Sequence, residues 1–262
     1  MGILTLLTDF GLRDAYVGVM KGAIAQINPA LTVIDLTHQI PPQDIAAARF
    51  HLMAAYPYFP AGTVHVAVVD PGVGGTRRAI ALQLTDGYLV GPDNGLFGGV
   101  VEGHPVVAAV ELVNPAYWRT ASPSVTFHGR DVFGPVGAHL ASGVALTELG
   151  PAIAPDSLIK LDIPPWQQAE TYITGHVQTI DQFGNAITTI PAVAVAGQTW
   201  ELRLGDRTIP HCQTYSDRHP GDLLTLIGSH GFVEIACSQG SAEATLGIRV
   251  GQAVALRLSP KG

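Results

Sequence analysis

The first half of the chain alternates short apolar runs, rich in β-branched residues, with longer segments of helical periodicity. Strands are predicted at 3–7, 32–36 and 64–69, and helices at 14–27 and 44–55. The run at 64–69 is almost continuously apolar, which is typical of a strand covered on both faces. Asp14 is placed to cap the first helix through its carboxylate. The alternation predicts an α/β fold for this half.

A second pattern follows these elements. Residues 79–84 and 88–90 are apolar runs that flank Asp86-Gly87, a turn pair typical of a hairpin. The rest of this half is mixed, with one further helix predicted at 131–140.

The character of the sequence changes near the middle of the chain, where Pro164 and Pro165 exclude regular helix. Short strands with turn signals between them are predicted at 172–179, 186–190, 199–204, 223–227, 232–236 and 253–258. This pattern favours a compact all-β, barrel-like domain. We therefore predict an N-terminal α/β domain at 1–164 and a C-terminal β-barrel domain at 165–262. A cleft between two unlike domains is a common place for a small-molecule site.

Composition narrows the classes of partner. Of 262 residues, 47% are hydrophobic, which is enough for a substantial core, and the net charge is −7. A chain without a broad basic surface is not expected to bind nucleic acid. Cys212 and Cys237 are too few for a disulfide framework, which favours a reducing cytoplasm. The sequence shows neither a secretory signal nor an apolar run of membrane-spanning length, so we expect no membrane association.

Two carboxylates follow predicted strands in the first half. Asp9 comes just past the first strand, where it could accept hydrogen bonds from two vicinal hydroxyls, or could simply form a turn. Asp70 ends the run at 64–69, and a glycine-rich loop after it can bring Arg77 back beside the carboxylate. That pair could be a reactive site or a structural ion pair. The glycines match neither a dinucleotide fingerprint nor a phosphate loop.

A histidine marks a third position. His128 stands beside Gly129 and before the charged pair Arg130-Asp131, so it has room for a ligand, although most histidines are structural. No His-Glu-x-x-His or Cys-x-x-Cys pattern is present, and we expect no metal site.

The second half contains candidate binding groups. Residues 181–185 are turn-like and present Asp181 and Asn185 together, which could hold an ammonium group or stabilise a β-turn. Tyr215 and the stretches 229–232 and 236–241 offer an aromatic face and backbone groups suited to a purine. Core packing and turns explain these stretches equally well.

Taken together, six motifs in order resemble the S-adenosylmethionine (SAM) hydroxide adenosyltransferase family over nearly the whole chain. These are Thr8-Asp9-Phe10-Gly11, Val69-Asp70-Pro71-Gly72-Val73-Gly74, Pro92-Asp93-Asn94-Gly95, Phe127-His128-Gly129-Arg130-Asp131, residues 181–185 and Ser238-Gln239-Gly240-Ser241-Ala242. The resemblance implies hydrolysis of SAM to adenosine and methionine, by water attacking the ribose C5′. It also implies an α/β domain followed by a β-barrel domain, and a homotrimer with SAM bound between neighbouring subunits. SAM is then the substrate, and no cofactor is expected.

The resemblance also implies a role for each matching residue. Asp70, Arg77 and His128 match the family's water-activating set, and Asp9 would hold the ribose hydroxyls. The methionine part would be held by Asp181, Asn185 and Ser229. Adenine would stack on Tyr215, and its edge would meet the backbone near Cys237 and Gln239. The chain departs from the usual pattern at Ser238, where relatives commonly carry Asn.

The family also contains SAM-dependent fluorinating and chlorinating enzymes. These resemble this chain but carry Tyr at the position of Asp70, which favours water as the nucleophile here. Gly129 argues against fluorination, since the fluorinating enzyme has Ser there, although the chlorinating enzyme also has Gly. Hydrolysis is the leading hypothesis. The alternatives are chloride-dependent halogenation, a SAM or adenosine sensor without significant turnover, and a two-domain scaffold whose motifs are turns.

Overall fold

The computed structural model describes residues 2–259, which form two compact units that divide between Leu161 and Asp162. The division falls three residues before the boundary that the paired prolines predict. Within the described residues, no helix is both long and apolar enough to span a bilayer.

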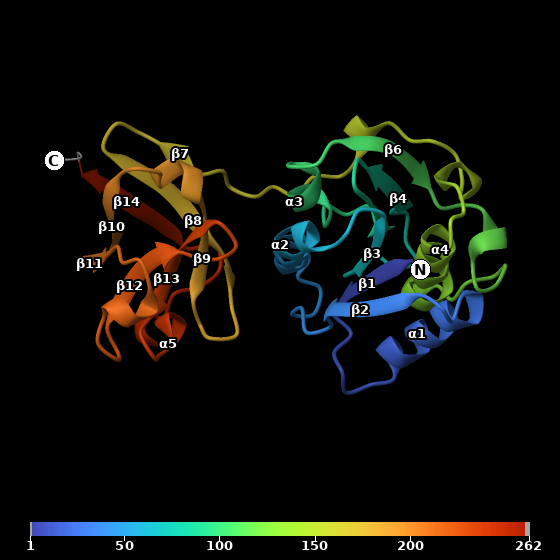
Figure 1. Ribbon diagram of the computed structural model, residues 1–262, viewed down its shortest axis with the longest axis horizontal. Coiled ribbons are helices and arrows are strands. Elements are labelled where there is room, and N and C mark those ends of the chain that lie inside the picture. Colours follow the sequence, from blue (N-terminus) through green and yellow to red (C-terminus); the bar gives the residue numbers. More distant parts are fainter. Residues whose placement is uncertain (1, 260–262) are drawn as a thin grey trace. The chain divides into compact units, whose positions relative to one another are not determined.

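The N-terminal unit is a six-stranded sheet with helices on both faces (Figure 1). The strand order is β2-β1-β3-β5-β4-β6, in which β1 to β3 and β5 are parallel and β4 is antiparallel to both neighbours. The strands are β1 Ile3–Thr8, β2 Thr32–Thr37, β3 Thr63–Val68, β4 Ala79–Leu84, β5 Gly87–Pro92 and β6 Val106–Glu111. The helices are α1 Tyr16–Ile27, α2 Ile45–Ala55, α3 Gly98–Val101 and α4 Gly134–Ala141, with 3₁₀ turns at Tyr56–Tyr58, Pro115–Tyr117, Leu146–Glu148 and Pro155–Ser157. The predicted α/β class is confirmed.

Strand β3 separates two apolar cores. All six of its residues are buried, as its continuous apolar run predicts. Val64 and Val66 face the core beneath α1 and α4, whereas Ala67 and Val69 face the core beneath α2 and α3. The alternation of a strand therefore divides one apolar segment between both layers of helices.

Two local predictions need correction or refinement. Asp14 does not cap α1, because that helix begins at Tyr16 after Ala15 and has no side-chain cap. By contrast, the Asp44 carboxylate accepts a hydrogen bond from the backbone of Ala47 at the start of α2. The helix predicted at 131–140 begins as a π-helix at Gly129–Phe133 before it continues as α4.

The C-terminal unit is an antiparallel, nearly closed barrel with strand order β11-β10-β14-β8-β9-β13-β12, to which β7 is added beside β8. The strands are β7 Gln167–Gln168, β8 Tyr172–Ile180, β9 Ala186–Pro191, β10 Thr199–Leu204, β11 Arg207–Pro210, β12 Leu223–Ile227, β13 Phe232–Cys237 and β14 Ala253–Ser259, with helix α5 at Ala242–Leu246 and 3₁₀ turns at Ala192–Val195 and Tyr215–Asp217. A bridge between His211 and Thr225 joins the two edges of the path. This confirms the predicted barrel-like domain.

The contact of α4 with the sheet gives a stability test. A Cβ at Gly137 would stand 2.4 Å from a methyl group of Val66 and 3.2 Å from one of Leu4. We expect Gly137→Ala to lower the free energy of unfolding by about 1–3 kcal/mol, because overpacking outweighs the helix propensity of alanine. Gly22 in α1 has nothing within 4 Å of its Cβ position, so Gly22→Ala should be neutral or stabilising by up to about 1 kcal/mol. Urea denaturation of both variants measures the difference, and equal effects would contradict this packing.

Candidate active site

A pocket of about 280 Å³ opens at the carboxyl ends of β1 and β3, and we call it the N-terminal pocket. Asp9 follows β1 directly, and Asp70 lies two residues beyond β3. The two strands are parallel neighbours, so their carboxyl ends bring both carboxylates to one edge of the sheet, where open α/β sheets bind ligands. The lining residues are Asp9, Phe10, Gln43, Val68, Asp70, Pro71, Val73, Thr126, Phe127, His128 and Gly129.

Arg77 joins Asp70 to His128. Its Nε lies 3.0 Å from both carboxylate oxygens of Asp70, and its Nη2 donates a further hydrogen bond to Oδ2. The same Nη2 lies 2.7 Å from Nδ1 of His128. The side chains of Asp70 and Arg77 are only 5% and 12% exposed, so water screens this pair weakly. The loop return predicted from the sequence is therefore present, with His128 as the third member.

The contact with Arg77 determines the state of His128. A guanidinium has only donors, so Nδ1 of His128 must accept and a neutral ring carries its proton on Nε2. Burial and the positive charge of Arg77 lower the pKa of His128, while Asp70 and Asp131 act in the opposite direction. The imidazole is therefore neutral at pH 7, with an N–H available on Nε2.

The segment that carries His128 is anchored by Asp131. The fully buried Asp131 carboxylate accepts hydrogen bonds from Arg130, Arg119 and the backbone of Ser124. The bonds from Arg130 hold the pKa of Asp131 well below its usual range, although burial opposes them. Asp131 lies in the π-helix that directly follows His128, and such local widenings are frequent at functional sites.

Asp9 is oriented by backbone groups. Its Oδ2 accepts a hydrogen bond of 2.8 Å from the backbone of Gln43, and the amide of Gly11 donates to the carbonyl of His38 at 2.7 Å. Gly11 has a φ of +68°, a conformation that favours glycine at the turn after Asp9.

Aromatic rings form one wall of the N-terminal pocket. The ring of Phe10 packs edge-on against those of Tyr16 and Phe127. A Cβ at Gly129 would stand 3.1 Å from the ring of Phe10, so this wall leaves little room for a side chain at that position.

The C-terminal unit carries its own pocket, of about 640 Å³, which we call the C-terminal pocket. All six binding residues predicted in this half line it, namely Asp181, Asn185, Tyr215, Ser229, Cys237 and Gln239. The Asp181 carboxylate accepts hydrogen bonds from the backbone of Phe183 and from the backbone and side chain of Asn185. It therefore stabilises the turn as well as lining the pocket. Ser238, where the chain departs from the family pattern, is buried and donates to the carbonyl of Arg218.

The C-terminal pocket also contains groups that the sequence analysis missed. Glu234, 3% exposed, accepts a hydrogen bond from the hydroxyl of Tyr215 at 2.8 Å, and Nε2 of His230 lies 3.1 Å from its other oxygen. Burial, with the bond to Glu234, raises the pKa of the Tyr215 hydroxyl. One signal was available in the sequence, since Glu234 is the one acid in the otherwise apolar run of β13.

Backbone strain marks both pockets. Gln43 and Gln239 are the two residues other than glycine with positive φ in the described part of the chain, at 67° and 51°. Gln43 lines the N-terminal pocket and Gln239 the C-terminal pocket. Such conformations are costly and cluster at functional sites, and periodicity gave no sign of either. Among residues 2–259, no group of three or more His, Cys, Asp or Glu side chains is arranged to hold a metal ion.

Both units match known domains. Residues 4–150 match the SAM hydroxide adenosyltransferase N-terminal domain, and residues 175–255 match the corresponding C-terminal domain. An (R)-S-adenosyl-L-methionine hydrolase from Salinispora arenicola is 43% identical over 249 residues, which are 95% of each chain. A fluorinase from an Actinoplanes species is 28% identical over 269 residues, or 89% of this chain and 90% of the relative. A crystal structure of a conserved protein from Thermotoga maritima superimposes with a TM-score of 0.92 at 35% identity, covering 97% and 99% of the two chains. The chain therefore belongs to the SAM hydroxide adenosyltransferase family.

Proposed function

We propose that this protein is an enzyme that hydrolyses S-adenosyl-L-methionine to adenosine and L-methionine. The observation that carries the proposal is the contact of Asp70, Arg77 and His128 at the edge of a pocket that also contains Asp9. The relatives' name and the family match support the same reaction.

Hydrolysis of SAM requires a positioned nucleophile. The sulfonium of SAM is already a good leaving group, so an oxygen held in line behind C5′ can displace it. The new C5′–O bond forms as the C5′–S bond breaks. The electron pair of the C5′–S bond stays on the sulfur, which leaves as the thioether of methionine. Water must lose a proton in this process, and a positioned acceptor contributes about 10²–10⁴ in rate.

The tautomer of His128 decides which residue accepts the proton of water. Because Nδ1 is occupied by Arg77, the Nε2–H group is the part of His128 that can contact the water oxygen, and it does so as a donor. Asp70 is then the proton acceptor, and Arg77 orients its carboxylate. Asp70 is the residue that argues for water rather than halide, since the halogenating enzymes that the chain resembles have no carboxylate there.

The binding groups divide between the two pockets. In this proposal Asp9 holds the ribose hydroxyls, and Asp181, Asn185 and Ser229 of the C-terminal pocket hold the methionine part. Tyr215 stacks on adenine, whose edge meets the backbone near Cys237 and Gln239. Because the relatives are named for the (R)-sulfonium epimer, we further propose that this chain prefers (R)-SAM.

We also propose that the enzyme is a homotrimer, in which the N-terminal pocket of one subunit and the C-terminal pocket of its neighbour form one site. The family resemblance is the basis of this arrangement, which would bring together the ribose group and the methionine groups that lie in different units. The free thiols of Cys212 and Cys237 support a cytoplasmic location.

Product analysis tests the reaction. We expect the purified protein to convert (R)-SAM to equimolar adenosine and methionine, at a rate that does not depend on chloride. Chromatography of the reaction over time measures both products. Asp70→Asn should reduce kcat by about 10²–10⁴ because a carboxamide cannot accept the proton of water, while SAM still binds through the other groups of the two pockets. Formation of a chlorinated nucleoside would identify a halogenase, and bound but unchanged SAM would identify a sensor.

The electrostatics of His128 give a second test. We expect its pKa to lie below 6.5 in a histidine NMR titration, with His128→Gln identifying the signal. Arg77→Gln should raise that pKa, because it removes a cation that opposes protonation and leaves Asp70 and Asp131, which favour it. Lys21→Gln, which removes a cation paired with Asp35 elsewhere, serves as the control. An unchanged pKa in Arg77→Gln would refute the assigned contact.

Subunit mixing tests the shared site. Asp70→Ala damages only the N-terminal pocket, and Asp181→Ala damages only the C-terminal pocket. If neighbouring subunits share each site, mixed oligomers of the two inactive variants contain intact sites and recover part of the wild-type activity. If each chain forms its own site, every site keeps one defect and no activity returns. Light scattering measures the expected mass of a trimer.

A further inference from the structure

The motif Pro92-Asp93-Asn94-Gly95 has no role in the reaction derived above, yet the sheet order places it beside the reactive loop. Strand β5 lies between β3 and β4, so the connection from β3 to β4 must cross the carboxyl end of β5. That connection, residues 69–78, carries Asp70 and Arg77. The motif begins at the last residue of β5 and therefore lies at the crossing point.

Asn94 holds the start of this loop. Its Nδ2 donates a hydrogen bond of 2.9 Å to the carbonyl of Val69, the residue immediately before Asp70. Its Oδ1 accepts from the backbone of Leu96, which orients the carboxamide. The last paired residues of β3 and β5 are Val66 and Val90, so the strands themselves do not pair at Val69. The Asn94 carboxamide supplies a hydrogen-bond donor there instead. Val69 is fully buried, where an unpaired carbonyl is costly.

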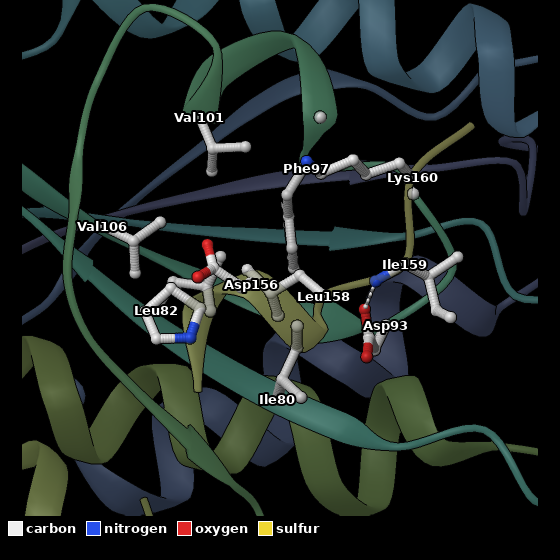
Figure 2. Close-up of a pocket in the computed structure, with 13 residues that line it drawn as sticks. Ile80, Leu82, Asp93, Phe97, Val101, Val106, Asp156, Leu158, Ile159 and Lys160 are labelled. Carbon is white, nitrogen blue, oxygen red and sulfur yellow. Dashed lines mark hydrogen bonds between the residues drawn. The ribbon is translucent and has the colours of Figure 1, made fainter. Parts of the chain in front are cut away.

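Asp93 holds the end of the loop. Its backbone amide donates to the carbonyl of Arg78 at 3.0 Å, and its carboxylate accepts from the Nε of Arg78 at 2.9 Å. The other oxygen accepts from the backbone of Ile159, as Figure 2 shows, where Asp93 also lines a cavity of about 310 Å³. The Asp93 side chain is only 3% exposed. A third hydrogen bond runs from Nη2 of Arg78 to the same carboxylate, so the residue after Arg77 is fixed through three hydrogen bonds to one aspartate.

We propose that Asp93 and Asn94 are positioning residues that hold Asp70 and Arg77 in register by clamping both ends of their loop. The loop needs such a clamp because it contains Gly72, Gly74 and Gly75, and glycine adds backbone freedom. Neither residue contacts the water or SAM in the reaction above. The catalytic consequence rests on the proposed function, whereas the effect on the loop does not.

Asn94→Ala and Asn94→Asp test the proposal, since the second keeps the size of the side chain but removes the donor to Val69. We expect kcat to fall about tenfold to a hundredfold in both, with KM little changed, because outer contacts orient reacting groups without binding substrate. Asn114→Ala is a matched control. Asn114 also donates to a distant carbonyl, Glu148 at 2.7 Å, and accepts from the amide two residues on, but outside the reactive loop. Its kcat should equal that of the wild type.

Hydrogen exchange supplies a readout that needs no activity. The amides of Val73 and Gly75 are hydrogen-bonded within the loop, so a loosened loop should exchange them faster in the Asn94 variants and not in Asn114→Ala. Unchanged exchange in the Asn94 variants overturns the proposal, and so does faster exchange with undiminished kcat. If the wild-type protein does not hydrolyse either epimer of SAM, the proposed function fails, and hydrogen exchange alone decides whether the clamp exists.

Discussion

The Arg77 guanidinium between Asp70 and His128 is the interaction on which the N-terminal pocket depends. It faces a carboxylate on one side and an imidazole on the other, within an enclosure that solvent barely reaches. A cation in that position pairs with Asp70, adds to the effect of burial in lowering the pKa of His128, and selects the tautomer of its ring. One side chain thereby orients the carboxylate and favours a neutral imidazole, which is the arrangement that the proposed activation of water requires.

The sheet topology explains why this interaction can form between residues far apart in sequence. Parallel strands β1 and β3 end at one edge, and the passage of the reactive loop over β5 returns Arg77 to the side of Asp70. His128 reaches the same edge from a separate segment, whose geometry depends on the buried Asp131. Packing of helices on both faces of β3 makes the edge rigid, because the strand cannot shift without disturbing two cores.

The two units carry different sets of polar groups. The N-terminal pocket contains Asp9, Asp70 and His128, whereas the C-terminal pocket pairs acidic and amide side chains with a tyrosine held by the buried Glu234. In the proposed function the first pocket acts on the ribose, and the second holds adenine and the methionine part. Each pocket also contains one glutamine in a strained backbone conformation, a feature that clusters at functional sites.

By itself, the sequence determined the α/β and β-barrel classes, the family, and the carboxylates that follow β1 and β3, because periodicity and strand ends are local properties. It also grouped the six residues that line the C-terminal pocket, through their motifs. Only the tertiary structure decided that Asp14 does not cap α1, that Glu234 orients Tyr215, that Gln43 bonds to Asp9, and that Asn94 supports Val69. These depend on contacts between distant segments, and on backbone angles that packing imposes, so no pattern along the chain encodes them.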